Sequence, residues 1–125
     1  FEANGFQVHT VSKGSFEGEG DALFAGRNLF CGWGFRSDRD AHEEVAQILN
    51  VKSLSLLKLI DPRFYHLDTC FCPLNSKLAM VFRGAFDQEA LKILEGAAKL
   101  VSNLLYDCVF TNSLLCVIIS FITIT

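Results

Sequence analysis

The chain has 125 residues, half of them hydrophobic and a fifth charged, and its formal net charge is −3. The length suits one domain, and the composition excludes a disordered, collagen-like or low-complexity chain, because disorder requires low hydrophobicity with high net charge. Eleven basic against fourteen acidic residues leave no basic patch for a phosphate backbone, so we expect no nucleic-acid partner. The chain opens on Phe1 without a signal-peptide pattern, and we expect it to be a piece of a longer protein.

The first half of the chain predicts short strands around one helix. Alternating residues favour a strand over residues 6–11, and two short β runs follow at residues 22–24 and 28–31. A helix is predicted over residues 41–49, and the next strand over residues 51–59. The candidate caps of this helix are Ser37, Asp38 and Asp40, its first-turn acids Glu43 and Glu44, and its predicted buried face Val45, Ile48 and Leu49.

The second half predicts two strands and a second helix. The strands are expected at residues 65–73 and 77–83, and the helix at residues 88–100. Strands that alternate with helices indicate the α/β class, although consecutive strands without an intervening helix exclude a simple parallel sheet. The predicted buried face of the second helix is Leu91, Leu94, Ala98 and Val101.

The last fifth of the chain is almost uncharged, since Asp107 is the only charged residue from Val101 onward. Residues 114–124 are almost entirely apolar, but a membrane helix needs about 20 such residues and basic flanks, so we expect no membrane anchor. Two interpretations of this segment stay open, a buried strand or a tail that does not belong to the native core. We therefore divide the chain into a domain of residues 1–103 and an apolar tail of residues 104–125.

The cysteines indicate a reducing compartment. Their number is five, and an odd count without a secretory signal argues against a disulfide framework. We therefore expect a cytoplasmic protein. The five are Cys31, Cys70, Cys72, Cys108 and Cys116.

An acidic, glycine-spaced loop is the first candidate site. Glu17, Glu19 and Asp21 alternate with glycines, which let a ligand approach the backbone closely. Carboxylates this close repel one another unless a cation lies among them, and a planar guanidinium suits bidentate carboxylates. A solvated loop is the simpler alternative, and a calcium site would need more oxygen ligands than this loop offers.

The second candidate is the stretch from His66 to Cys72. On a strand, His66, Asp68, Cys70 and Cys72 would share one face. Four such ligands in a row cannot converge on one zinc ion, whereas a histidine two residues before an aspartate suits an acid/base beside a substrate-holding carboxylate. A core histidine with satisfied hydrogen bonds is the alternative.

Arg36 is the third candidate, because it lies between a glycine-rich stretch and a helix start. Such a corner can present a guanidinium to a carboxylate. A surface ion pair with Asp38 or Asp40 is the alternative.

Together, the segments 16–21, 32–38 and 65–74 resemble the guanidine-modifying (pentein, amidinotransferase) superfamily, with the dimethylarginine dimethylaminohydrolase-like or arginine-hydrolysing branch as the best match. The resemblance covers residues 6–87. It implies a partial α/β propeller with about two of the family's five ββαβ modules. It also implies a small-molecule guanidino substrate and no cofactor or metal.

The resemblance assigns a role to each candidate residue. In this family a cysteine attacks the guanidinium carbon, a histidine protonates the leaving amine, and water then cleaves the thiouronium to a ureido product such as citrulline. His66 resembles the acid/base, and Glu17 the acid that supports it, with Glu19 competing for that place because the loop has one residue more than the family pattern. The residues that resemble substrate-binding groups are Asp68, Asp21, Arg36 and Glu19.

The family's nucleophilic cysteine has no match in this sequence, because Cys70 and Cys72 read as core thiols and Cys108 and Cys116 lie in the unlike tail. We expect a fragment of a guanidino hydrolase that is inactive alone. The alternatives are an inactive module that binds arginine-like ligands, or a structural fragment. An incomplete propeller leaves unpaired strand edges, so homo-oligomers are a further expectation.

Overall fold

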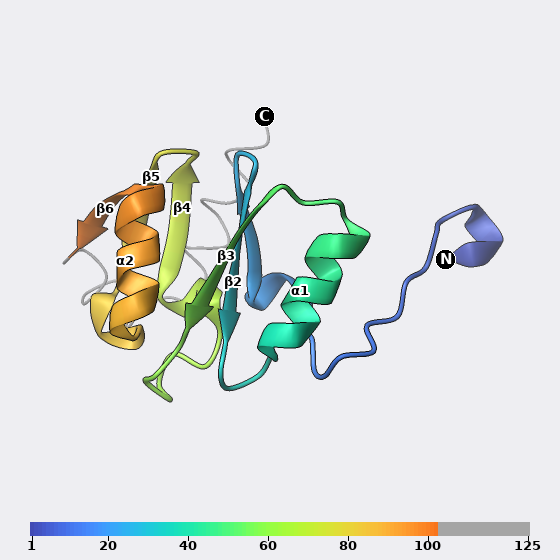
Figure 1. The fold of residues 1–125 in the computed structure, drawn as a ribbon, viewed down its shortest axis with the longest axis horizontal. Coiled ribbons are helices and arrows are strands. Elements are labelled where there is room, and N and C mark those ends of the chain that lie inside the picture. Colours follow the sequence, from blue (N-terminus) through green and yellow to red (C-terminus); the bar gives the residue numbers. More distant parts are fainter. Residues whose placement is uncertain (103–125) are drawn as a thin grey trace.

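The computed structural model describes residues 1–102 of the chain (Figure 1). The expected apolar tail, together with Cys108 and Cys116, lies outside the described residues. In the part that is described, no helix is long and apolar enough to cross a membrane.

The first ββαβ module is built from residues 22–58. Strands β1 (Ala22–Ala25) and β2 (Asn28–Trp33) form an antiparallel hairpin, helix α1 (Arg39–Ile48) follows, and β3 (Ser53–Lys58) returns parallel to β2. The sheet order is β1-β2-β3. The helix makes the crossover that a parallel pair requires.

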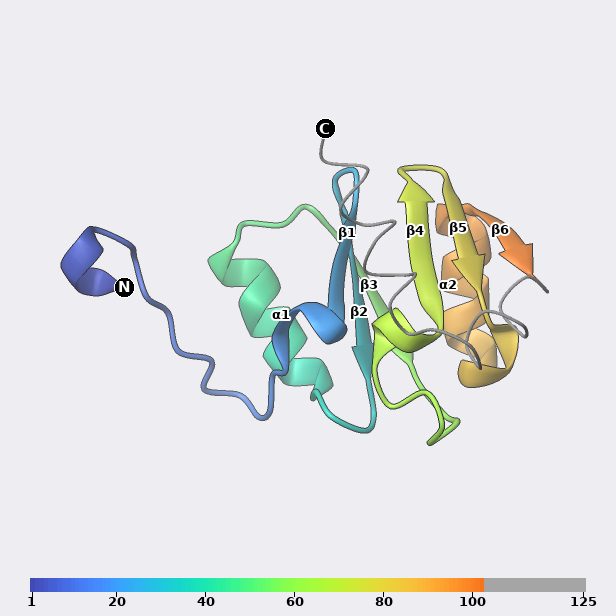
Figure 2. The ribbon, with the colours of Figure 1, turned by 180° about the vertical axis from the view of Figure 1, so that it is seen from behind.

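The second module repeats this order. Strands β4 (Phe71–Asn75) and β5 (Leu78–Val81) form the hairpin, α2 (Gln88–Ala97) follows, and β6 (Lys99–Ser102) pairs parallel to β5. In Figure 2, β4 and β5 stand in front of α2, which therefore covers one face of its sheet. The α/β class and the two ββαβ modules expected from the resemblance are confirmed.

The two modules correspond residue by residue over most of their length. A short 3-10 turn precedes each hairpin, Gly18–Gly20 before β1 and Leu67–Thr69 before β4. Each long helix begins directly after an aspartate, Asp38 in the first module and Asp87 in the second. The separation of these aspartates along the chain equals that of Glu17 and His66, which directly precede the two turns. Glu17 and His66 thus hold corresponding positions.

One hydrophobic core joins the modules. The rings of Phe30 from β2 and Phe71 from β4 lie 5.0 Å apart between centroids, and Leu59 after β3 forms a β-bridge with Phe86 before α2. Both pairs belong to a single buried cluster. Burial of aromatic and aliphatic side chains on this scale is the main stabilising contribution.

The predicted strand at residues 6–11 is wrong. Residues 1–10 are all exposed, and the segment extends away from the sheets in Figures 1 and 2. Its alternating pattern finds no partner strand, and Phe6 instead packs edge-on against Phe1, which is also exposed. A strand pattern without a neighbour to supply ladder hydrogen bonds does not form a strand.

The predicted face of the first helix is only partly right. Val45 is buried, but Ile48 and Leu49 at the end of α1 are exposed. Asp38 is the N-cap, yet its carboxylate makes no capping bond and accepts from the Ser15 backbone N–H instead. The residues that α1 buries are Ala41, His42, Val45 and Ala46.

Two element boundaries differ in the second half. His66 is extended and is followed by the 3-10 turn, so the strand begins at Phe71 and the interpretation of His66 and Asp68 as same-face strand residues is wrong. The second helix ends at Ala97, and Lys99 pairs with Leu78 as the first residue of β6. Residues 99–102 pair with the open edge of β5 and gain ladder hydrogen bonds that they could not make in a longer helix. This pairing outweighs their helix propensity.

Candidate functional site

The candidate site lies where the loop before β1 meets the segment that links the modules. Glu17 and Asp21 flank the turn Gly18–Gly20, and His66 immediately precedes the turn Leu67–Thr69. The two turns contact each other. Asp21 and Leu67, which are 46 positions apart in the chain, are therefore brought together by the docking of one module on the next.

His66 lies between two carboxylates. Its Nε2 is 3.4 Å from Glu17 Oε2, and its Nδ1 is 3.2 Å from Asp21 Oδ2, although the Nδ1 contact lacks hydrogen-bond alignment. The ring is about one-fifth exposed, with 19% of the side chain accessible. Gly20 allows this approach, because a Cβ there would lie 3.2 Å from His66 Nδ1. A histidine held this way can exchange protons while staying in reach of solvent.

Asp21 is anchored on both carboxylate oxygens. It is 1% exposed, its Oδ1 accepts the backbone N–H of Leu67 at 3.0 Å, and its Oδ2 accepts the hydroxyl of Ser37 at 2.7 Å. A buried carboxylate needs such donors to remain charged. Asp21 thus ties the acidic loop to the residue that follows His66.

Arg36 contacts the same cluster from the loop between β2 and α1. Its Nε donates to Glu17 Oε1 at 3.0 Å, and its guanidinium lies over the ring of Tyr65, 5.7 Å from the centroid. The ion pair that Arg36 forms is therefore with Glu17, and the alternative pairing with Asp38 or Asp40 is wrong. The side chain is half exposed, at 49%, so this pairing contributes little to stability.

Asp68 completes the acidic cluster. Burial raises the pKa of its carboxyl group above 3.8, the positive field of His66 opposes this rise, and the negative charges of Asp21 and Glu19 add to it. A carboxylate in this setting gains when a cation arrives, because the cation relieves the repulsion. Glu19 is exposed and lies in the turn between Glu17 and Asp21. Within residues 1–102, no three His, Cys, Asp or Glu side chains are arranged to hold a metal ion.

The described thiols are core residues. Cys31, Cys70 and Cys72 are all buried. Burial, assisted by the charge of Asp21, raises the pKa of Cys31 to about 12, and burial likewise raises the pKa of Cys70 well above 9.0. The nucleophilic form of cysteine is the thiolate, which these two sites suppress.

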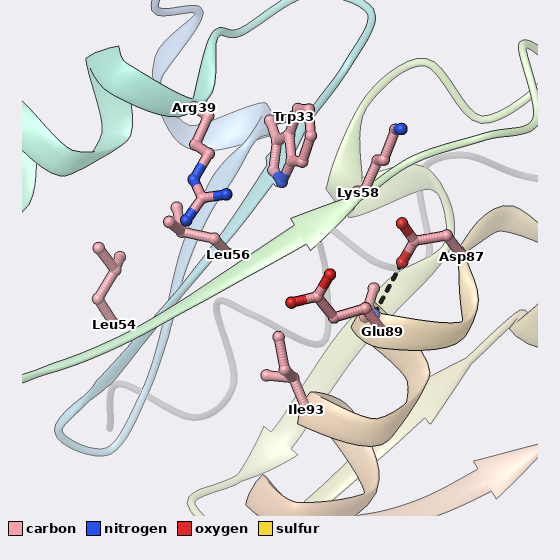
Figure 3. Close-up of a pocket in the computed structure, with 9 residues that line it drawn as sticks. Trp33, Arg39, Leu54, Leu56, Lys58, Asp87, Glu89 and Ile93 are labelled. Atoms are coloured by element: carbon pink, nitrogen blue, oxygen red, sulfur yellow. Dashed lines mark hydrogen bonds between the residues drawn. The ribbon is translucent and has the colours of Figure 1, made fainter.

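A separate cavity of about 200 Å³ lies between the modules on their helix side (Figure 3). Arg39 and Lys58 line it from the first module, and Asp87 and Glu89 from α2. Two of these groups already have partners: Arg39 pairs with Glu43, and Asp87 caps α2 through the N–H of Ala90. The His66 cluster, with its partly exposed ring and unrelieved negative charge, is the stronger candidate.

The structure brings His66, Glu17, Asp21 and Arg36 into direct contact and places Asp68 and Glu19 within their electrostatic reach. The sequence argument missed Ser37, which it considered only as a helix cap. The residues next to Ser37 in the sequence give no signal that its side chain is buried. Its burial is explained by the acidic loop, which lies far away in the sequence but contacts Ser37 in the fold.

Searches with protein-family models found no match. Curated proteins similar to the chain include the bifunctional arginine dihydrolase/ornithine cyclodeaminase AgrE of Nostoc, 49% identical over 98 residues, which cover 76% of this chain and 14% of that protein. The N(G),N(G)-dimethylarginine dimethylaminohydrolase of Mycobacterium tuberculosis is 43% identical over 74 residues, 59% of this chain and 24% of that protein. The chain thus spans a minor part of the length of these relatives.

Solved structures show the same similarity. The chain resembles the cyanobacterial arginine dihydrolase ArgZ in its apo form with a TM-score of 0.78 and 42% identity, over 87% of this chain and 18% of that one. It also resembles the N-terminal domain of ArgZ with a covalently bound reaction intermediate, with a TM-score of 0.74 and 42% identity, over 82% of this chain and 39% of that one. The chain thus shares its fold with part of ArgZ.

Proposed function

Because the chain belongs to the guanidine-modifying, or pentein, superfamily, we propose that it supplies part of the active site of a hydrolase. The substrate is the guanidino group of arginine or of a methylated arginine, and the product is citrulline. The observation that carries the proposal is His66, partly exposed between Glu17 and Asp21. This arrangement joins a proton carrier to groups that attract a guanidinium.

The proposed reaction has two halves. A cysteine thiolate attacks the central guanidinium carbon, and His66 donates a proton to the departing amine as its C–N bond breaks. Water then adds to the resulting thiouronium while His66 accepts a proton from it, and the C–S bond breaks to release the ureido product and the thiolate. Splitting one difficult substitution into two steps is the benefit of covalent catalysis.

The acidic residues and Arg36 bind the substrate or hold His66 in place. We assign Asp68 to the guanidinium nitrogens, because burial raises its pKa first and the charges of Asp21 and Glu19 add to the rise, and a bound cation would relieve that repulsion. Glu17 supports His66 through the Nε2 contact, with Glu19 one turn away for the substrate. The burial of Asp21 favours a role in holding His66 over direct contact with substrate. Arg36 would exchange Glu17 for the carboxylate of the bound amino acid.

The nucleophile is assigned to chain outside residues 1–102. Cys31, Cys70 and Cys72 are buried, and a thiol that stays protonated does not attack carbon. This same observation favours a second function, in which the chain binds an arginine-like ligand through Glu17, Arg36 and Asp68, with Asp21 holding His66, without turning it over.

A hybrid domain tests the hydrolase proposal. Residues 1–102 would replace the matching segment in the N-terminal domain of ArgZ, which brings the remaining modules. We expect the hybrid to form a ureido product from arginine, and His66→Ala to lower kcat by about 10²–10⁴-fold, the usual contribution of a positioned acid/base. The matched control is His9→Ala, since His9 is exposed in the N-terminal segment.

The outcomes separate the two functions. A folded hybrid in which His66→Ala retains the parent kcat overturns the hydrolase assignment. Arginine titrated into the 125-residue chain by calorimetry measures binding independently. Binding that is lost in Asp68→Ala, together with an inactive folded hybrid, would leave the binding module as the function.

A further inference from the structure

Ser37 joins two of the acidic residues of the site. Its hydroxyl donates to Asp21 Oδ2 at 2.7 Å and accepts the backbone N–H of Glu17 at 3.0 Å. The side chain is 2% exposed, so neither contact competes with water. One hydroxyl therefore fixes the carboxylate next to His66 Nδ1 and the backbone of the residue whose carboxylate lies next to Nε2.

The second module shows that the fold does not need this polar pair. Counted from the aspartate N-caps Asp38 and Asp87, Ser37 corresponds to Phe86, and Asp21, which ends the first 3-10 turn, corresponds to Cys70. Cys70 and Phe86 are core residues at 0% and 3% exposure. The same module positions are therefore apolar in one copy and carry a hydrogen-bonded hydroxyl and carboxylate in the other.

A buried polar pair costs desolvation that an apolar pair does not. In the first module the polar pair is Ser37 and Asp21, and Asp21 contacts His66. In the second module the corresponding residues lie in the hydrophobic core. The contrast assigns the pair to the site rather than to folding.

We propose that Ser37 is a positioning residue of the hydrolase site, which acts through Asp21 and Glu17 to fix His66 between their carboxylates. The proposal rests on the function proposed above. Removal of the hydroxyl leaves Asp21 Oδ2 without its donor and the Glu17 N–H without its acceptor. Apart from their contacts with His66, Asp21 then keeps only the Leu67 N–H and Glu17 only the exposed Arg36 pairing, so both carboxylates can shift. A displacement of about 1 Å at a reacting group can cost on the order of 10²-fold in rate.

Kinetics of the hybrid domain test the catalytic half of this proposal. We expect Ser37→Ala to lower kcat by about 10- to 100-fold with little change in KM, because Ser37 does not touch the substrate. Ser37→Thr keeps the hydroxyl and should recover most of the loss. Ser15→Ala is the matched control, since Ser15 contacts Asp38 through its backbone alone. A kcat for Ser37→Ala within about twofold of the parent, measured well below its melting temperature, overturns the proposal.

The 125-residue chain provides a second readout that does not need activity. With ¹⁵N-histidine labelling, the ring nitrogen signals of His66 report its tautomer and hydrogen bonding. We expect them to shift in Ser37→Ala, to return toward the parent in Ser37→Thr, and to stay in place in Ser15→Ala. Unchanged His66 signals in folded Ser37→Ala overturn the proposal. A folded hybrid without activity refutes the hydrolase function, and the His66 signals still decide whether Ser37 positions the ring.

Discussion

The guanidinium of Arg36 rests on the carboxylate of Glu17, with Nε donating to Oε1 at 3.0 Å. Glu17 is also the residue whose other oxygen lies beside His66 Nε2. The carboxylate thus already holds one guanidinium that belongs to the protein. Exposure of both side chains means that the pairing can be exchanged at low cost.

Arg36→Ala should therefore separate substrates by their carboxylate. In the hybrid domain we expect kcat/KM for arginine to fall by about 10- to 100-fold, the effect of losing a hydrogen bond to a charged group of about 1.5–3 kcal/mol. Agmatine has no carboxylate and should change little. Arg39→Ala is the control, because Arg39 pairs with Glu43 on α1. Equal losses for both substrates would contradict the assignment.

The charged form of Asp68 should lower the stability of the fold and strengthen arginine binding. Burial raises its pKa in the folded chain above 3.8, so the folded state binds this proton more tightly than the unfolded state. Stability from this group is present below pH 3.8 and is lost as the pH rises through the raised value. Asp68→Asn should therefore raise Tm at pH 7 and give no such gain below pH 3.8, while arginine binding weakens. Thermal melts at both pH values and calorimetry check this, and a lower Tm at pH 7 would count against it.

His42 should make the chain sensitive to mild acid. Burial lowers its pKa below 6.5, against the opposing effects of its hydrogen bond with the Gly32 carbonyl at 2.7 Å and of nearby carboxylates. At higher pH the ring is neutral in both states. As the pH falls below 6.5 the unfolded state takes up the proton first, so the folded state loses stability until its own lowered pKa is passed.

Urea unfolding between pH 7.5 and 5.5 measures this effect. We expect the free energy of unfolding to fall with pH in the parent, and to fall less in His42→Gln, which keeps a donor for the Gly32 carbonyl. His9→Gln, an exposed control, should retain the parent slope. The same slope in His42→Gln as in the parent would assign the pH dependence to other groups.

The thiols should be protected by the fold. Burial raises the pKa of Cys31 to about 12 and that of Cys70 well above 9.0, and Cys72 is also buried. Iodoacetamide at pH 8 should leave these three unmodified in the native chain and alkylate them in denaturant, because the reagent needs an accessible thiolate. Peptide mapping by mass spectrometry reads each cysteine separately. Rapid native modification of Cys70 or Cys72 would reopen the question of a nucleophile in this segment.

Local patterns predicted the elements that their own residues stabilise. The hairpin of β1 and β2 and the start of α2 after Asp87 follow from turn and cap residues within a few positions. The strand at residues 6–11 and the buried face ending in Ile48 and Leu49 were wrong, because a partner strand and a covering surface are set by tertiary contacts that sequence spacing does not contain.

The site was predictable in composition and not in geometry. The acidic loop and His66 were identified from residue types and from the resemblance, and the structure places them in contact. The link from Arg36 to Glu17 and the role of Ser37 could not be predicted, because both depend on how the loop after β2 folds over the loop before β1. Such contacts join segments far apart in the chain.

Glu17 and His66 occupy corresponding positions in the two modules, and each is the residue directly before a 3-10 turn. A chain that grows by gene duplication would place the two copies of one ancestral residue against each other at the seam. Divergence at that single repeat position then yields a histidine in one copy and a carboxylate in the other. A lone module, however well folded, carries half of such a pair, so the chemistry is a property of the repeat number rather than of the repeat.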